Sequence, residues 1–203
     1  TSCFSVSVYE DLLGRIHLKM PGKHNVSNAL AAVAAGLQMD IPFNQVKEAL
    51  EKFRGVHRRF EVLGEAQGVI IVDDYAHNPT KLKAALSGAR ASYDRRIIAI
   101  FQPHRYGRVK RLADEFSKSF SQSDVLIVAP IYAANEAPIE GVTAEKLAAA
   151  IAANGHEDIT YISSKDQIVS YLIDIVRPND IVITMGAGDI WEVGHKLLDQ
   201  LKK

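Results

Sequence analysis

From residue 59 onward the chain repeats one pattern, in which a short run of apolar, mostly β-branched residues is followed by a stretch with helical periodicity. The apolar runs lie at 97–101, 125–128, 159–162 and 181–185. The helical stretches lie near 109–120, 144–153, 165–176 and 190–201. Strands that are apolar throughout belong in a parallel sheet, because helices cover both of its faces. We therefore predict an α/β fold with a Rossmann-like, doubly wound, mostly parallel sheet.

The first 53 residues have a different pattern. Apolar and polar residues alternate over two short stretches, and helical spacing follows on both sides of Pro42. This pattern predicts strands over 4–8 and 16–20 and helices over 26–37 and 46–53. We place a boundary near 52–56, where Gly55 can break the second helix. The predicted domains are residues 1–53 and residues 54–203, and the second also contains β-rich runs at 60–63 and 69–72.

Composition argues against several classes of function and of site. Twenty-four Lys and Arg balance twenty-four Asp and Glu, so no global field would hold a polyanion, and bulk nucleic-acid binding is excluded. The single cysteine, Cys3, cannot form an intrachain disulfide or a cysteine-based zinc site. No apolar run approaches the roughly 18–20 residues of a membrane span. We expect a cytoplasmic protein that binds neither membranes nor nucleic acid.

Ligands of such sheets bind at the carboxyl ends of the strands, so the loops there are the first candidates for a site. The loop after residue 72 carries Asp73, Asp74 and His77. A carboxylate at this place can accept hydrogen bonds from ribose hydroxyls or help to hold hydrated Mg²⁺. The alternative is that an aspartate caps the turn and that His77 is a solvated loop residue.

The loop after residue 101 carries His104, Arg105 and Arg108, and this group of cations suits a carboxylate or a phosphate. Its alternative is a solvated basic helix face. The loop after residue 128 has no specific signal. The loop after residue 185 carries Gly186 and Gly188, but it lacks the third glycine of a dinucleotide fingerprint and follows the last strand. A tight turn is the preferred interpretation, with NAD binding as the weaker one.

Two upstream segments complete the candidates. Asn25 and Asn28 are three residues apart and share a helix face, where they can cap the helix or contact a base edge. Arg58 and Arg59 lie in the boundary segment, where an arginine can reach a phosphate when two domains close, or simply be exposed on a linker. The sequence contains no G-x-x-x-x-G-K-[ST] phosphate loop and no HExxH, GxSxG or CxxC motif.

Taken together and in order, six segments resemble the Mur ligase family of peptidoglycan synthesis: 21–29, 55–60, 73–79, 101–106, 132–139 and 185–189. The resemblance implies an ATP- and Mg²⁺-dependent ligase that forms an amide bond through an acyl phosphate. It further implies that the substrates are UDP-N-acetylmuramate and L-alanine. The alternatives are a murein-recycling tripeptide ligase, a folylpolyglutamate-synthetase-like ligase and, in another class, a non-catalytic nucleotide-binding module.

The resemblance also implies roles for single residues. It assigns Asn25 and Asn28 to the adenine side of an ATP site, Asp74 to the ribose and Arg59 to the γ-phosphate. It assigns four residues to recognition of L-alanine and the acyl phosphate: His77, His104, Arg105 and Arg108. Where this branch of the family is expected to have His-His-Pro, the chain has Asn78 between His77 and Pro79.

Finally, the resemblance implies that residues 1–53 are the end of a central ATPase domain and that residues 54–203 are the amino-acid-binding domain. The phosphate loop and the Mg²⁺-binding glutamate are then expected upstream of Thr1. On this basis we expect the chain to be inactive alone. We also expect the apolar faces of residues 1–53 to pack on the second domain or on another copy of the chain.

Overall fold

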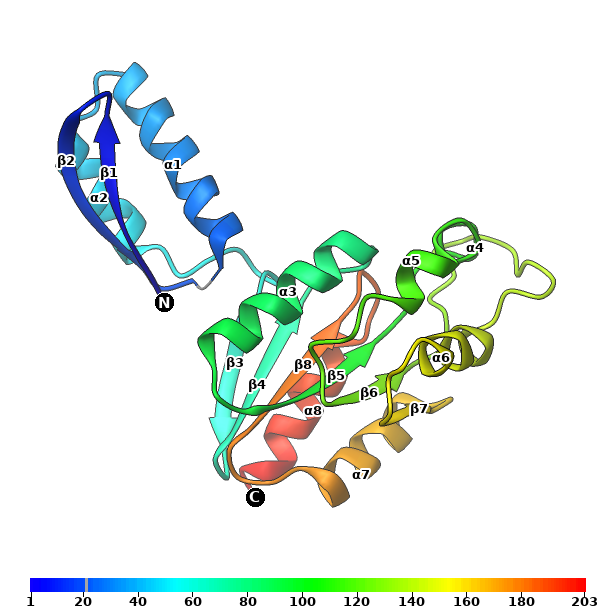
Figure 1. Ribbon diagram of the computed structural model, residues 1–203. Helices are drawn as coiled ribbons and strands as arrows, with labels where there is room; N and C mark the ends of the chain where they lie inside the picture. The colour runs from blue at the N-terminus through cyan, green and yellow to red at the C-terminus, as the bar shows by residue number, and fades with distance from the viewer. Residues whose placement is uncertain (21) are drawn as a thin grey trace.

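The computed structural model describes residues 1–20 and 22–203. Residue 21, the first of one of the family-like segments, lies outside the described residues. The first part of the chain is an antiparallel hairpin covered by two helices (Figure 1). Its elements are β1 (Ser2–Val8), β2 (Asp11–Leu18), α1 (Lys23–Gln38) and α2 (Phe43–Lys52). A small core centred on Val6, Ile16 and Val33 holds them together and confirms the predicted hairpin and helices.

The second part is a six-stranded sheet in the order β3-β4-β8-β5-β6-β7. The strands are β3 (Glu61–Ala66), β4 (Val69–Asp74), β5 (Arg96–Phe101), β6 (Val125–Val128), β7 (Ile159–Tyr161) and β8 (Asp180–Met185). All neighbouring pairs are parallel except β3 and β4, which form an antiparallel hairpin at one edge. The predicted mostly parallel sheet is confirmed.

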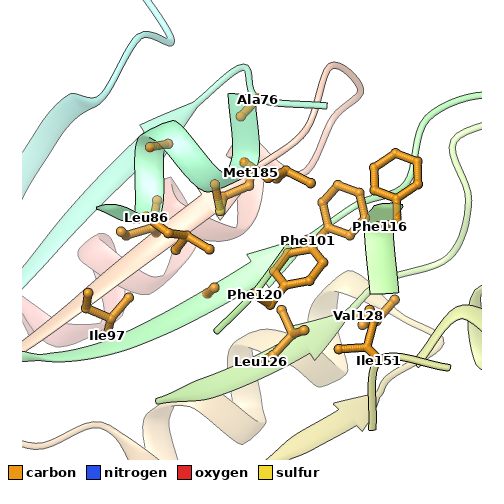
Figure 2. Packing of buried hydrophobic residues seen from close by; sticks show 14 of the residues in the cluster. Ala76, Leu86, Ile97, Phe101, Phe116, Phe120, Leu126, Val128, Ile151 and Met185 are labelled. Atoms are coloured by element: carbon orange, nitrogen blue, oxygen red, sulfur yellow. The ribbon is translucent and has the colours of Figure 1, made fainter. Parts of the chain in front are cut away.

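Helices cover both faces of this sheet, as its apolar strands require. One face carries α3 (Pro79–Ser92), α4 (Tyr106–Arg111), α5 (Ala113–Ser117) and α6 (Ala144–Ala153). The other carries α7 (Lys165–Ile175) and α8 (Trp191–Leu201). Figure 2 shows the first of these two cores, where Phe101 packs against Phe116 and Phe120 with ring centroids 5.5 and 5.2 Å apart.

Two local predictions were wrong. The single helix predicted over 109–120 is two short helices, interrupted at Leu112, whose backbone is not helical. Apolar spacing is continuous across the break because Leu112 itself packs on the core, so periodicity alone could not reveal it. The connection between the predicted strands 4–8 and 16–20 is also shorter than expected, because Tyr9 adopts a φ of 51° and β2 begins at Asp11.

Candidate active site

The carboxyl ends of β4, β8, β5 and β6 meet along one edge of the sheet. The register sets Asp74 beside Met185, Met185 beside Phe101 and Phe101 beside Val128. The four loops singled out from the sequence therefore leave the sheet next to one another. This shared edge, and the linker that enters it at residues 54–60, contain most of the candidate residues.

A cavity of about 550 Å³ opens between α1, the linker and α3. Asn25 and Asn28 line it from α1, Arg59 from the linker and Asp74 from the end of β4. The remaining lining residues are Met20, Phe53, Val56, Phe60, Thr80, Lys81, Ala84, Ala85 and Gly88. Four polar residues singled out separately from the sequence thus share one cavity whose other walls are largely apolar.

Asp74 also closes the turn between the linker and α3. One carboxylate oxygen accepts a hydrogen bond from the Phe60 N–H at 2.8 Å, and the other accepts one from the Ala76 N–H at 2.7 Å. Burial raises the pKa of Asp74, and these two N–H groups together with the nearby Arg59 oppose that rise. The capping alternative is therefore correct for this carboxylate, and each oxygen keeps lone-pair capacity for a further donor at the cavity.

The two adjacent arginines of the linker have different surroundings. Arg58 Nε donates to Asp73 at 2.9 Å, and its two Nη atoms donate to the carbonyls of Gly188 and Gly186 at 3.1 and 2.8 Å. Asp73 is 1 % exposed and also accepts from the Thr184 hydroxyl at 2.6 Å. Arg58 therefore fastens the linker to the sheet edge with three of its five N–H groups.

Arg59, by contrast, is exposed. Both guanidinium groups approach the Tyr75 ring, with Arg58 Cζ 5.0 Å and Arg59 Cζ 5.7 Å from its centroid. Arg58 and Phe60 on either side of it have φ values of 59° and 48°. These left-handed residues make adjacent side chains point in different directions. The alternation leaves the Arg59 guanidinium at the cavity while Arg58 is directed into the sheet edge.

A second cluster lies on the loops after β4 and β5. The His77 and His104 rings are 5.9 Å apart, and Arg108 Nη1 lies 3.2 Å from His104 Nδ1. His77 Nδ1 lies 2.7 Å from the carbonyl oxygen of Tyr75. Tyr75 links this cluster to the cavity, because its ring contacts both Arg59 and His77. The structure thus brings His77, His104 and Arg108 together.

The hydrogen bonds define the tautomers of the two imidazoles. A carbonyl only accepts, so His77 Nδ1 carries the hydrogen and the neutral ring presents a lone pair at Nε2. Arg108 only donates, so His104 Nδ1 accepts and the neutral ring presents N–H at Nε2. Burial, with the neighbouring Arg108, lowers the pKa of both histidines. One ring therefore offers an acceptor and the other a donor near neutral pH.

The Arg105 side chain is exposed, and its charge acts on both His104 and Arg108. Its backbone adopts a φ of 69° at the start of α4. Its N–H donates to the Tyr132 carbonyl at 2.8 Å, which joins the loop after β5 to the loop after β6. Glu136 on the latter loop accepts from the Gly107 N–H at 2.9 Å. Glu136 therefore fastens α4 rather than standing exposed.

Sequence reasoning missed several residues that organise this edge. Gln102 is 6 % exposed; its Nε2 donates to Asp189 at 2.7 Å, and Lys165 donates to the other Asp189 oxygen at 2.7 Å. Gly188 lies so close to Gln102 and Tyr132 that an added Cβ would be within 2.6 Å of both. Gln102 and Tyr132 both lie in segments that carry the family resemblance, but neither was given a role from the sequence.

Asn78, the departure from the expected His-His-Pro, is the N-cap of α3. Its side-chain oxygen accepts from the Lys81 N–H at 3.0 Å, and Pro79 follows as the first helical residue. The position therefore has a local role in starting the helix.

Within residues 1–20 and 22–203, no group of three or more His, Cys, Asp or Glu side chains is arranged to hold a metal ion. The described helices also include none that is long and apolar enough to cross a bilayer.

Comparison with known proteins explains the arrangement. The sequence profile described as "Mur ligase, glutamate ligase domain" matches residues 58–188. The chain belongs to the Mur ligase family. Two similar curated proteins are both named UDP-N-acetylmuramate--L-alanine ligase. The one from Geotalea uraniireducens is 48 % identical over 202 residues, and the one from Desulfosudis oleivorans is 50 % identical over 196 residues.

These matches cover 100 % and 96 % of this chain but only 44 % and 43 % of the two relatives. The chain thus spans less than half the length of these family members. Among solved structures, the UDP-N-acetylmuramate-alanine ligase of Thermotoga maritima is 28 % identical, with a TM-score of 0.78, over 92 % of this chain and 39 % of that one. A murein peptide ligase from Psychrobacter arcticus is 26 % identical, with a TM-score of 0.67, over 100 % of this chain and 42 % of that one.

Proposed function

We propose that this chain is part of an ATP-dependent ligase that joins L-alanine to UDP-N-acetylmuramate through an acyl phosphate. The observation that carries the proposal is the cavity, where an arginine, a carboxylate and two amides from three separate segments converge. The names of the two relatives support the choice of substrates. In this reaction the muramate carboxylate attacks the γ-phosphate of ATP and ADP leaves, which gives the acyl phosphate. The amine of alanine then attacks the acyl carbon, loses a proton and displaces phosphate.

The groups at the cavity suit a nucleoside triphosphate. The side-chain amides of Asn25 and Asn28 can donate to and accept from an adenine edge, and the apolar walls can pack on its ring. The Asp74 carboxylate can accept from ribose hydroxyls. Arg59 supplies a planar, permanently charged group that can neutralise charge on the transferred phosphoryl group. We assign these four residues to ATP.

Magnesium fits this proposal only if its main ligands lie elsewhere, because the described residues do not form a cluster of metal-binding side chains. When bound, Mg²⁺ would neutralise charge on the phosphates. The part of the chain described here would orient the nucleotide and present Arg59.

We assign His77, His104, Arg105 and Arg108 to the amino acid and the acyl phosphate. The cationic Arg105 and Arg108 suit a carboxylate or a phosphoryl group. The neutral His104 can donate from Nε2, and the neutral His77 can accept a proton at Nε2. An amine must lose a proton as it attacks the acyl carbon, so an acceptor in this position is chemically useful.

The domain division belongs to the same proposal. Residues 1–53 have a small core of their own, and the two sheet cores draw on residues from 60 onward. This supports reading residues 1–53 as the end of an ATPase domain and residues 54–203 as the amino-acid-binding domain. We place the enzyme in the cytoplasm, where ATP is available. Several large apolar side chains of residues 1–53 are exposed, among them Leu12, Leu30 and Met39, and they support contact of this part with another domain or another copy of the chain.

A chimera tests the proposed reaction. This chain replaces the matching 202 residues of the Geotalea uraniireducens relative, and the intact relative is the control. We expect phosphate release only when UDP-N-acetylmuramate, L-alanine and Mg-ATP are all present. A folded chimera that accepts a tripeptide in place of L-alanine would indicate the recycling ligase. A folded chimera with ATP-binding but no ligase activity would indicate the non-catalytic module.

A further inference from the structure

The loop after β6 is fastened to the loop after β5 through Tyr132. Its N–H donates to the Pro103 carbonyl, and its carbonyl accepts from the Arg105 N–H, both at 2.8 Å. These bonds form an isolated parallel bridge between His104 and Tyr132 beyond the ends of the strands. The backbone of Tyr132 therefore holds its side chain beside His104 whatever that side chain is.

The two rings lie one on the other. Their centroids are 5.4 Å apart and their planes differ by 9°. An offset-stacked pair of this kind restricts how either ring can turn. The Tyr132 side chain also packs directly against Gly188, where an added Cβ would lie 2.6 Å from Tyr132 Cγ and Cδ2 and closer still to Gln102 Oε1. The backbone angle of Gly188 does not demand glycine, so space is the reason for it.

We propose that Tyr132 is a positioning residue that holds the His104 imidazole, and that Gly188 lacks a side chain so that the Tyr132 ring can occupy its place. The effect of Tyr132 on catalysis rests on the proposed function, in which His104 contacts L-alanine. Stacking keeps His104 Nδ1 beside Arg108 Nη1, 3.2 Å away, so that the hydrogen of the neutral ring stays on Nε2. The Tyr132 hydroxyl has no part in this arrangement.

The surroundings of His104 make its titration a direct readout. Arg108, Arg105, His77 and Glu136 all act on it electrostatically, and burial is the main cause of its lowered pKa. Tyr132 covers one face of the His104 ring, and its replacement leaves the four charged or titratable neighbours of His104 in the chain. Removal of the Tyr132 ring should therefore expose His104 and bring its pKa closer to the ordinary value of about 6.5.

The experiment follows the imidazole C–H signals of this chain by NMR across pH, with His104 identified from a His104→Gln variant. Tyr132→Ala should raise the His104 midpoint, and Tyr132→Phe, which keeps the stack, should match the wild type. Gly188→Ala should act like Tyr132→Ala. Tyr132→Leu is included in case the alanine variant is unstable. An unchanged His104 midpoint in folded Tyr132→Ala or Tyr132→Leu would overturn the positioning role, and an unchanged midpoint in Gly188→Ala would overturn the role of Gly188.

Kinetics of the chimera separate this inference from the proposed function. Tyr132→Ala should raise KM for L-alanine by about two- to tenfold, the worth of a lost aromatic stack, with KM for ATP unchanged. Tyr132→Phe should restore the wild-type KM. If the His104 titration moves while KM for L-alanine does not, the positioning of His104 stands and its assignment to the amino acid fails. If the chimera is inactive throughout, the titration alone decides the inference.

Discussion

Arg58 and Arg59 are adjacent in the sequence, but the structure predicts a much larger loss of stability for Arg58→Ala than for Arg59→Ala. Arg58→Ala removes one ion pair and two hydrogen bonds to carbonyls. It leaves Asp73, which is 1 % exposed, with Thr184 as its remaining side-chain partner. Loss of one member of a buried ion pair costs about 3–5 kcal/mol. For a chain of this size, that corresponds to a decrease in Tm of roughly 6–20 °C.

Arg59→Ala is the matched control, because it removes the same side chain from the next position. Arg59 is exposed and contacts the Tyr75 ring at 5.7 Å, so its loss should cost at most about 1 kcal/mol. Urea unfolding followed by circular dichroism measures both free energies of unfolding. Asp73→Asn combined with Arg58→Ala should recover part of the loss, because no unpaired carboxylate would remain buried. Equal stability of the two alanine variants would refute the division of roles between Arg58 and Arg59.

Three further predictions concern stability. Burial lowers the pKa of His156 in the folded chain below the ordinary value of about 6.5. Between these two pKa values the unfolded chain binds more protons than the folded chain. The free energy of unfolding should therefore decrease on acidification through this range. Urea midpoints at successive pH values measure this effect, and a His156→Asn variant with an unchanged pH dependence would contradict it. Asn78→Ala should cost about 1 kcal/mol through loss of the Lys81 N–H acceptor, whereas Asn78→Asp should keep the wild-type Tm. Phe101→Ala should lower the free energy of unfolding in urea by about 3–5 kcal/mol, because Phe101 is fully buried against two other phenylalanines. A smaller decrease would show that the core collapses around the gap.

The parts of the fold that could be predicted from the sequence are those in which the spacing of apolar residues indicates which side chains are buried. The apolar strands ending at Phe101, Val128 and Met185 were found because both faces of the sheet are covered, and parallel order then placed their loops together. The break at Leu112 was invisible because apolar spacing continues through it.

From the residues alone, without the family resemblance, the candidate site could be predicted only to the level of residue type and segment. The sequence placed two arginines in the linker, and the fold bonds Arg58 to Asp73 and leaves Arg59 lining the cavity. The partner of Asp73 was likewise invisible, because Arg58 reaches it through folding and not through sequence spacing. Tyr132 acts through a ring contact between two loops, and no local pattern signals such a contact.

The measurement that tests the central claim most directly is the rate of phosphate release by the chimera carrying Arg59→Ala. Arg59 is assigned to charge that develops on the transferred phosphoryl group, so its loss should lower kcat by about a thousandfold or more while the variant stays folded. The wild-type chimera, measured with UDP-N-acetylmuramate, L-alanine and Mg-ATP, provides the reference. Near-normal turnover of a folded Arg59→Ala variant would contradict the account.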